Sequence, residues 1–391
     1  MKTATIKRLA GSCFIGVIGA FFFSTCAFAR DITLTPSIRF KQEYNDNILF
    51  TRTNEIDDYI SYIIPALKIR QKTEVLDISA LAEGNFFFYA DESQLNDINQ
   101  RYRLDGRYKL TERWSVKGRG FYLKDTTLNS QLRETGTVGF RQRRERVDAG
   151  GGLGYRMSER SNMDFDYRYI QTNFQRPSSV DTEFHQTYLS YSRRLKNERD
   201  VISVIPEFTY GTSDAWDVYN YNFDVRWQHP FSETLDLFFQ VGARGTQQKF
   251  KYDRDNSNTL GGVADIRLRK RGETTSGLIG FRQRLLPDSD GQIRNISRLY
   301  CDVRRSVYQR LGIALVGSVY YSRLEEKDPL FDDDRWYFEI TPSVFYRLAE
   351  NYRVSMVYSY SQEHDLNIDR NPRKDRQRVW ISLDMAFPKK W

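Results

Sequence analysis

The sequence has few cysteines and, beyond its first residues, no long apolar run. Its three cysteines are Cys13, Cys26 and Cys301. We expect the first two to leave with an N-terminal targeting segment, so an internal disulfide is excluded and a secreted chain must gain its stability elsewhere. After residue 29 no apolar run reaches the roughly 18 residues of a transmembrane helix, so we expect none.

Histidine is also scarce. The three histidines, His185, His229 and His364, are expected on separate hairpins, with His229 beside a short turn and His364 in a long loop. A lipase or deacylase would need a serine and a histidine side by side, at matched height on neighbouring strands, which Ser190 and His185 do not suggest. The sequence therefore predicts no enzyme and no cofactor, and nothing in it points to nucleic acid.

The N-terminus has the pattern of a secretory signal. Lys2, Lys7 and Arg8 form a positive start, an apolar run follows from Leu9 to Phe23, and Ala27-Phe28-Ala29 is an A-x-A cleavage site. The run is too short to span a bilayer. We therefore expect residues 1–29 to be a cleaved signal peptide, with cleavage read by Ala27 and Ala29, and residues 30–391 to form the mature protein.

Aromatic residues are abundant, at 15% of the chain, and the formal net charge is +8. From Arg101 to Leu110, apolar or aromatic residues alternate with charged ones. The pattern resumes at Trp114 and recurs along the mature chain in segments of about ten residues, the period of a half-buried β-strand.

These segments come in pairs joined by short connections, and longer, polar and often acidic connections separate the pairs. The short connections are 71–74, 111–113, 157–161, 196–200, 232–234, 271–273, 308–310 and 349–351. The long ones lie near 46–58, 90–97, 125–137, 174–183, 212–218, 246–258, 286–295, 323–334 and 362–376. Together they predict eighteen strands, within about two, with both chain ends on the short-turn side.

This asymmetry predicts an all-β fold: one transmembrane antiparallel β-barrel of the outer membrane of a Gram-negative bacterium, with short periplasmic turns and long extracellular loops. Closure removes strand edges, whose unpaired backbone groups would cost several kcal/mol each in hydrocarbon. Trp114, Tyr155, Trp227, Tyr346 and Tyr352 lie near the short turns and fit an aromatic girdle. A soluble sandwich is the less favoured alternative.

A charge at the middle of the lipid face costs about 2–4 kcal/mol, so the charged face must point inward. The predicted cations of the lumen, the expected substrate path, are Arg101, Arg103, Arg107, Lys109, Lys117, Arg119, Arg144, Arg146, Arg168, Arg194, Arg226, Arg244, Arg267, Arg269, Arg282 and Arg304. They favour an anion-selective pore, since a charged wall concentrates counter-ions. Alternatively, they pair with interleaved aspartates and stiffen the barrel.

Several other motifs leave alternatives open. The inward aromatics Phe87, Tyr89, Phe121 and Tyr320 could stack on sugar rings or fill the lumen. The acidic clusters 288–291 and 332–334 could bind Ca²⁺, although solvated loop tips are commoner. The run 150–152 of three glycines lies inside a strand, so we expect it to permit curvature or a close approach rather than to bind phosphate.

The C-terminus is an alternating strand, Arg378 to Phe387, that closes on Trp391. It looks like the signal by which the barrel-assembly machinery receives outer-membrane proteins. Pro388 cannot donate a ladder hydrogen bond, so regular pairing is expected to stop near Phe387.

The start of the mature chain resembles a known family. Thr35-Pro36-Ser37-Ile38-Arg39-Phe40 followed by Glu43-Tyr44-Asn45-Asp46-Asn47-Ile48 is similar to the opening of the putative outer-membrane barrels of the beta-barrel porin 2 type, as are the prolines inside strands at Pro65, Pro206 and Pro342. Some members accompany PEP-CTERM and exopolysaccharide gene sets. The resemblance implies an outer-membrane channel tied to polysaccharide export and gives no residue roles.

The leading expectation for function is passive export of an anionic exopolysaccharide through the arginine-rich lumen. The alternatives are a general or anion-selective porin, and a non-conducting surface or adhesion barrel. The expected partners are outer-membrane lipid and lipopolysaccharide, the barrel-assembly machinery and periplasmic polysaccharide-export proteins. No metal ligand or catalytic residue is predicted.

Overall fold

The computed structural model describes residues 31–136, 141–176, 179–251, 255–287, 292–325, 333–367 and 372–391. The predicted signal peptide, with Ala27 and Ala29, lies outside these residues. No helix in the described ranges has the length and apolarity to cross a membrane.

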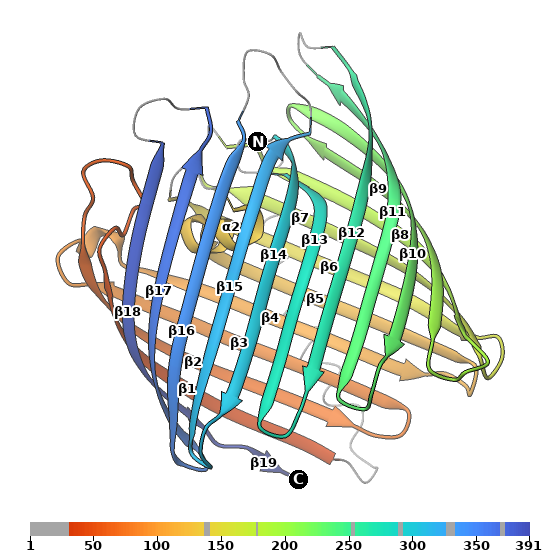
Figure 1. The fold of residues 1–391 in the computed structure, drawn as a ribbon, viewed down its shortest axis with the longest axis horizontal. Coiled ribbons are helices and arrows are strands. Elements are labelled where there is room, and N and C mark those ends of the chain that lie inside the picture. The colour runs from red at the N-terminus through yellow and green to blue at the C-terminus, as the bar shows by residue number, and fades with distance from the viewer. Residues whose placement is uncertain are drawn as a thin grey trace, which may run out of the picture.

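The described residues form one closed antiparallel sheet of eighteen long strands and one two-residue strand (Figure 1). The strands are β1 (Asp31–Asn45), β2 (Asp58–Lys72), β3 (Leu76–Tyr89), β4 (Asp97–Lys109), β5 (Trp114–Thr126), β6 (Arg143–Arg156), β7 (Ser161–Phe174), β8 (Thr182–Arg194), β9 (Val201–Ser213), β10 (Trp216–Pro230), β11 (Leu235–Phe250), β12 (Ser257–Arg271), β13 (Thr275–Pro287), β14 (Ile293–Ser306), β15 (Leu311–Leu324), β16 (Arg335–Ala349), β17 (Tyr352–Asp365), β18 (Arg373–Ala386) and β19 (Lys389–Lys390). Closure comes from β1, which pairs with both β2 and β18. The predicted barrel and strand number are confirmed.

The eight short turns lie where the sequence predicts them, and their chemistry recurs. In five of them a Ser, Thr or Asn side chain accepts a hydrogen bond from a backbone N–H two or three residues later, which replaces a ladder bond at the turn. The accepting residues are Thr73, Thr111, Ser158, Asn197 and Ser232. A glutamate follows each of them in the sequence.

Three other expectations need correction, on a connection, on His364 and on the length of the strands. The predicted long connection 212–218 is wrong, because only Asp214 and Ala215 separate β9 from β10. Trp216 is 1% exposed and packs in an apolar cluster there, and this burial holds its backbone in the sheet. His364 belongs to β17 rather than to a loop. The strands have 13 to 16 residues rather than about ten, so the wall is taller than the bilayer requires.

The two faces of the wall separate as predicted. Outward positions are apolar and exposed, as at Ile63, Leu67 and Phe223, whereas buried charged side chains such as Arg144 and Glu363 lie on the other face. Because side chains alternate with period two, one residue of register slip would place arginines in lipid, so the lipid face fixes the register.

The described parts of two long connections lie inside the barrel. Helix α2 (Thr127–Thr135), which follows β5, lies inside the wall (Figure 1). The connection 46–57 places Phe50 against Leu128 and Leu132 of α2 and against the inward rings Tyr320 and Tyr337. The connection 90–96 carries a short 3-10 helix, η1 (Ser93–Leu95). Together, α2 and 46–57 fill the lumen beside β1, β2 and β14–β18.

The last residues continue the seam with one interruption. β18 ends at Ala386, and β19 then pairs with Thr33 and Leu34 of β1 in the same register. The Phe387 N–H still donates to the carbonyl of Pro36, so regular pairing stops at Pro388, close to where the sequence predicts it. It resumes for the last residues, where Trp391 exchanges backbone hydrogen bonds with Ile32.

Candidate passage through the barrel

Helix α2 is anchored at its C-terminal end by backbone geometry. Gly136 caps the helix with φ 74°, and its N–H donates to the carbonyl of Leu132. A Cβ at Gly136 would lie 2.7 Å from the Cβ of Tyr320. The Tyr320 hydroxyl donates to the carbonyl of Arg133 at 2.7 Å. Only glycine combines this conformation with this close approach.

Charge anchors the same end of α2. Arg144, 4% exposed, donates to both Asp125 and Glu134, and Arg146 lies 3.6 Å from the Glu134 carboxylate. Burial opposes ionisation of Glu134, but Arg144 and Arg146 outweigh it and hold the pKa of Glu134 below its ordinary value. The helix is thus held on one side by an apolar cluster and on the other by a buried ion pair.

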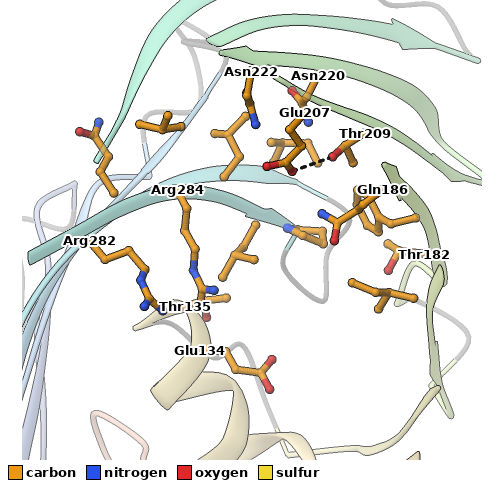
Figure 2. Close-up of a pocket in the computed structure, with 18 of the residues that line it drawn as sticks. Glu134, Thr135, Thr182, Gln186, Glu207, Thr209, Asn220, Asn222, Arg282 and Arg284 are labelled. Carbon is orange, nitrogen blue, oxygen red and sulfur yellow. Dashed lines mark hydrogen bonds between the residues drawn. The ribbon is translucent and has the colours of Figure 1, made fainter. Parts of the chain in front are cut away.

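A cavity of about 400 Å³ remains between α2 and the wall from β6 to β14. Uncharged amides and hydroxyls gather on one side of it, from β7 to β11: Thr172, Thr182, Gln186, Thr209, Asn220, Asn222 and Gln240. The same side also carries Arg168, Glu207, Asp224 and Arg244. On the opposite side, Arg282 and Arg284 of β13 extend toward Glu134 and Thr135 of α2 (Figure 2). The cavity therefore combines charged groups with neutral hydrogen-bonding groups.

A second cavity, of about 610 Å³, lies toward the short turns. Six cations line it, Lys68, Arg70, Arg103, Arg107, Lys117 and Arg119, against three carboxylates, Asp77, Asp105 and Asp166. Its lining continues that of the first cavity, because β7 contributes Asp166 here and Arg168 above, and β8 contributes Tyr188 here and Gln186 above. The two cavities thus lie one above the other along the same strands.

The glycines of β6 form a flat strip under this path. Lys117 of β5 pairs in register with Gly152, and Gly152 pairs with Asp166 of β7. The Lys117 ammonium crosses this strip to lie 2.8 Å from Asp166, and a Cβ at Gly152 would lie 2.4 Å from the Asp166 carboxylate. Arg119 likewise crosses Gly150 and donates to the Tyr188 hydroxyl on β8 at 3.1 Å. The glycine run serves a close approach, one of the two roles its sequence suggests.

The sixteen predicted cations all belong to the inward face, but they have different surroundings. Eleven have a carboxylate within ion-pair distance in the described residues: Arg101, Arg103, Lys117, Arg144, Arg146, Arg168, Arg244, Arg267, Arg269, Arg282 and Arg304. Arg119 and Arg226 donate to neutral side chains instead. The predicted ion pairs are present, and some of the predicted cations have no carboxylate within ion-pair distance in the described residues. The role of these residues in transport stays a prediction.

Several inward charges escaped sequence reasoning. Arg284 and Arg298 continue the alternation of β13 and β14, and Arg376 and Arg378 continue that of β18. Extending the inward face to the end of each strand would have found them. Arg376 is 1% exposed, lies over the Phe50 ring and leaves Nε and Nη1 without a hydrogen-bond partner in the described residues.

The predicted aromatics mostly fill space. Phe87 is packed under the connection 46–57, and Tyr320 lies under α2, so neither ring is free to stack on a sugar. His229 lies beside a short turn, as expected, with Nδ1 2.6 Å from Asp200. Hydrogen bonds from Asn197, His229 and Trp227 lower the pKa of Asp200.

The acidic clusters give no metal site in the part of the chain that is described. Residues 288–291 and Asp332 lie outside that part, as does Val138 in the connection to β6. Asp333 pairs with Arg294 and Arg335, and these two cations overcome burial to lower the pKa of Asp333.

Comparison with known proteins agrees with this architecture. The family model described as Putative beta-barrel porin 2 matches residues 31–175, which confirms the resemblance seen in the sequence for that part of the chain. No curated protein matches. A closed wall with an apolar outer face and a charged inner face is an outer-membrane barrel, and porin-type barrels are, as a class, not enzymes.

Solved outer-membrane proteins are similar in structure over most of this chain. OccK2 of Pseudomonas aeruginosa in complex with glucuronate is 10% identical with a TM-score of 0.49, and the match covers 91% of this chain and 98% of that one. OpdK of the same organism with vanillate is 8% identical with a TM-score of 0.48, and the match covers 92% of this chain and 99% of that one. OccAB3 of Acinetobacter baumannii is 10% identical with a TM-score of 0.46, and the match covers 92% of this chain and 99% of that one.

Proposed function

Taking a porin-like barrel of the outer membrane as the premise, we propose that this chain is an anion-preferring channel. The observation that carries the proposal is the lining of its path. Six arginines and four carboxylates line the upper cavity, and six cations and three carboxylates line the lower one. A net positive wall in a confined space lowers the barrier for anions and raises it for cations.

Ion selectivity in a planar bilayer tests this proposal directly. In a KCl gradient the reversal potential is expected to show a chloride preference, and Arg284→Gln to reduce that preference. Arg305→Gln is the matched control. Arg305 lies two positions after Val303 on β14 and therefore shares its outward face, so this substitution removes one positive charge outside the lumen. Cation preference in the unmodified channel contradicts the proposal, and absence of channel events favours a structural or adhesion barrel.

The finer proposal is export of an acidic exopolysaccharide. It is supported by the amides and hydroxyls opposite Arg282 and Arg284, since such groups bind sugar hydroxyls while guanidinium groups bind uronate-like carboxylates. Deleting the gene should abolish acidic surface polysaccharide, and a plasmid copy should restore it. An unchanged capsule would contradict export and favour a general or small-anion porin.

The remaining partners belong to this proposal as well. The alternating β18, closed by the aromatic Trp391, supports recognition by the barrel-assembly machinery. The apolar outer face supports contact with outer-membrane lipid and lipopolysaccharide, and residues 1–29 are proposed to be removed on secretion. Periplasmic polysaccharide-export proteins are proposed as partners only if the export proposal holds.

A further inference from the structure

The wall is not paired over its full height between β12 and β13. Their ladder runs from Arg271↔Ser276 to Ala264↔Gln283 and ends there. Beyond that point Ser257–Val263 of β12 stays paired with β11, and residues 284–287 of β13 stay paired with β14. The upper part of β13 bends away from β12, which continues upward with β11 (Figure 1). Two strand edges therefore face each other without hydrogen bonds.

The cause of this split is a cluster of apolar side chains inside the barrel. Ile293 and Leu285, from the upper ends of β14 and β13, pack against Phe184, Trp216 and Val218 of β8 and β10. Burying these side chains draws β13 and β14 across the lumen and away from β12. Gly211 makes room for the cluster, since a Cβ there would lie 2.4 Å from the Phe184 ring.

The split opens within the apolar zone of the membrane. The paired part covers eight positions, from Ala264 to Arg271 on β12. At about 3.3 Å per residue and a tilt of about 40°, eight positions reach only about 20 Å, against an apolar band of about 25 Å. The edges thus separate at the level of the outer leaflet, where Leu260 is 93% exposed. Unpaired backbone is tolerated at this depth where it lines a water-filled cavity.

The upper cavity of the lumen reaches both edges of the split. Val263 and Ala264 of β12 line it, and so do residues 284–287 of β13. Next to the end of the ladder the facing residues carry no polar side chain, namely 260–264 of β12 and 285–287 of β13, whereas Arg282 and Arg284 precede them on β13. Arg284 is exposed to this space and has no ion pair or hydrogen bond with the described residues. An apolar slot thus leads to an available guanidinium.

On the lumen side a single carboxylate spans the split. Glu325, after β15, accepts hydrogen bonds from Arg244 of β11 at 2.6 Å and from Thr259 of β12 at 2.8 Å. Its other oxygen accepts from Asn295 of β14 at 3.3 Å. Glu325 therefore holds the β11–β12 hairpin at a fixed distance from β14, so that the strands neither close the split nor separate further.

We propose that this split is a lateral passage between the lumen and the outer leaflet, for amphipathic anions with a single alkyl chain. The alkyl chain lies between the apolar edges, and the carboxylate or phosphate headgroup binds Arg284. An added strand from another protein fits less well, because Pro287 lacks a backbone donor at the edge where it would pair. The proposal does not depend on which solute crosses the full channel.

Cysteine cross-linking in a Cys301→Ser background tests the geometry. If the ladder continued in register, Gly262 would face Leu285, as Leu268 faces Ile279 in the paired part. The two pairs are six positions apart, so they occupy equivalent places in the ladder repeat. In native membranes under mild oxidation, the control Leu268→Cys/Ile279→Cys is expected to form its disulfide, and Gly262→Cys/Leu285→Cys to stay reduced. Equal cross-linking of both pairs overturns the proposal.

Block of the channel in planar bilayers tests the ligand, with dodecanoate as the probe. Dodecanoate is expected to reduce the current at a concentration at least about tenfold below that of acetate, and Arg284→Gln to raise that concentration about tenfold, as for the loss of one charged hydrogen bond. Dodecyl maltoside, with the same alkyl chain and no charge, is expected to block weakly. Equal block by dodecyl maltoside, or by dodecanoate in Arg284→Gln, overturns the proposal.

These tests separate this inference from the proposed function. A channel without chloride preference refutes the proposed function and leaves the cross-linking result unaffected. A cross-linked split refutes the lateral passage and leaves the chloride preference unaffected.

Discussion

The outer half of the lumen and the half near the short turns both carry inward arginines, but these arginines are buried in the first and exposed in the second. In the outer half, Arg144 and Arg378 are buried and bound to carboxylates, and apolar side chains pack against one side of α2. Near the short turns, Arg103 and Arg107 are exposed to an open cavity. Inward charge thus stabilises packing where loops fill the lumen and provides an electric field where they do not.

The largest effect is expected from breaking the buried pair of the outer half. Glu325→Ala leaves Arg244, 3% exposed, without its carboxylate. An uncompensated buried charge costs about 3–5 kcal/mol. The barrel should therefore lose its compact gel mobility at a lower temperature, and Arg244→Met/Glu325→Ala should recover much of the loss. The same midpoint for Glu325→Ala and the parent protein would contradict this account.

Removing an apolar contact of α2 should come next. Leu132 is 0% exposed between α2 and the inward rings, and Leu→Ala in such a site costs about 2–5 kcal/mol. Leu132→Ala should loosen α2 and raise both the mean single-channel conductance and its noise. Leu268→Ala, on the lipid face, is the matched control. Unchanged conductance in Leu132→Ala would mean that α2 does not restrict the passage.

Acid should loosen the same helix through Glu134. Because its pKa is lowered in the folded protein, the ionised carboxylate stabilises the docked helix above the ordinary glutamate pKa of about 4.3, and this contribution is lost as pH falls through the lowered value. Conductance should therefore rise below about pH 4. Glu134→Gln should show the raised conductance at neutral pH, whereas Glu112→Gln, in a short turn, should behave as the parent.

The smallest effect on stability, within about 0.5 kcal/mol, is expected in the half near the short turns. Arg107 lines the open cavity and makes no ion pair in the described residues. Arg107→Gln should leave the unfolding midpoint unchanged and lower the chloride preference. A marked loss of stability without a change in selectivity would show that the two halves of the lumen do not differ in the way described here.

Much of the wall was predictable because the face of each side chain and the position of each turn depend on residues that are close in the sequence. The alternation around Tyr102 and Tyr108 places each side chain on one face, and a turn such as Thr111-Glu112-Arg113 marks each reversal. The connection 212–218 misled because polarity predicts a loop without revealing that Trp216 is buried. The connection 125–137 was correctly expected between two strands, but its length and polarity do not distinguish a loop in water from a helix inside the barrel.

The sequence by itself determined a closed wall, its two faces, its turns and the basic character of its lumen, because a two-residue period and the cost of charge in hydrocarbon act on each strand separately. The tertiary structure decided which charges are neutralised, where α2 narrows the path and where β12 parts from β13. These features depend on contacts between distant residues, such as Ile293 with Trp216 and Glu325 with Arg244, which pack only after the barrel has closed.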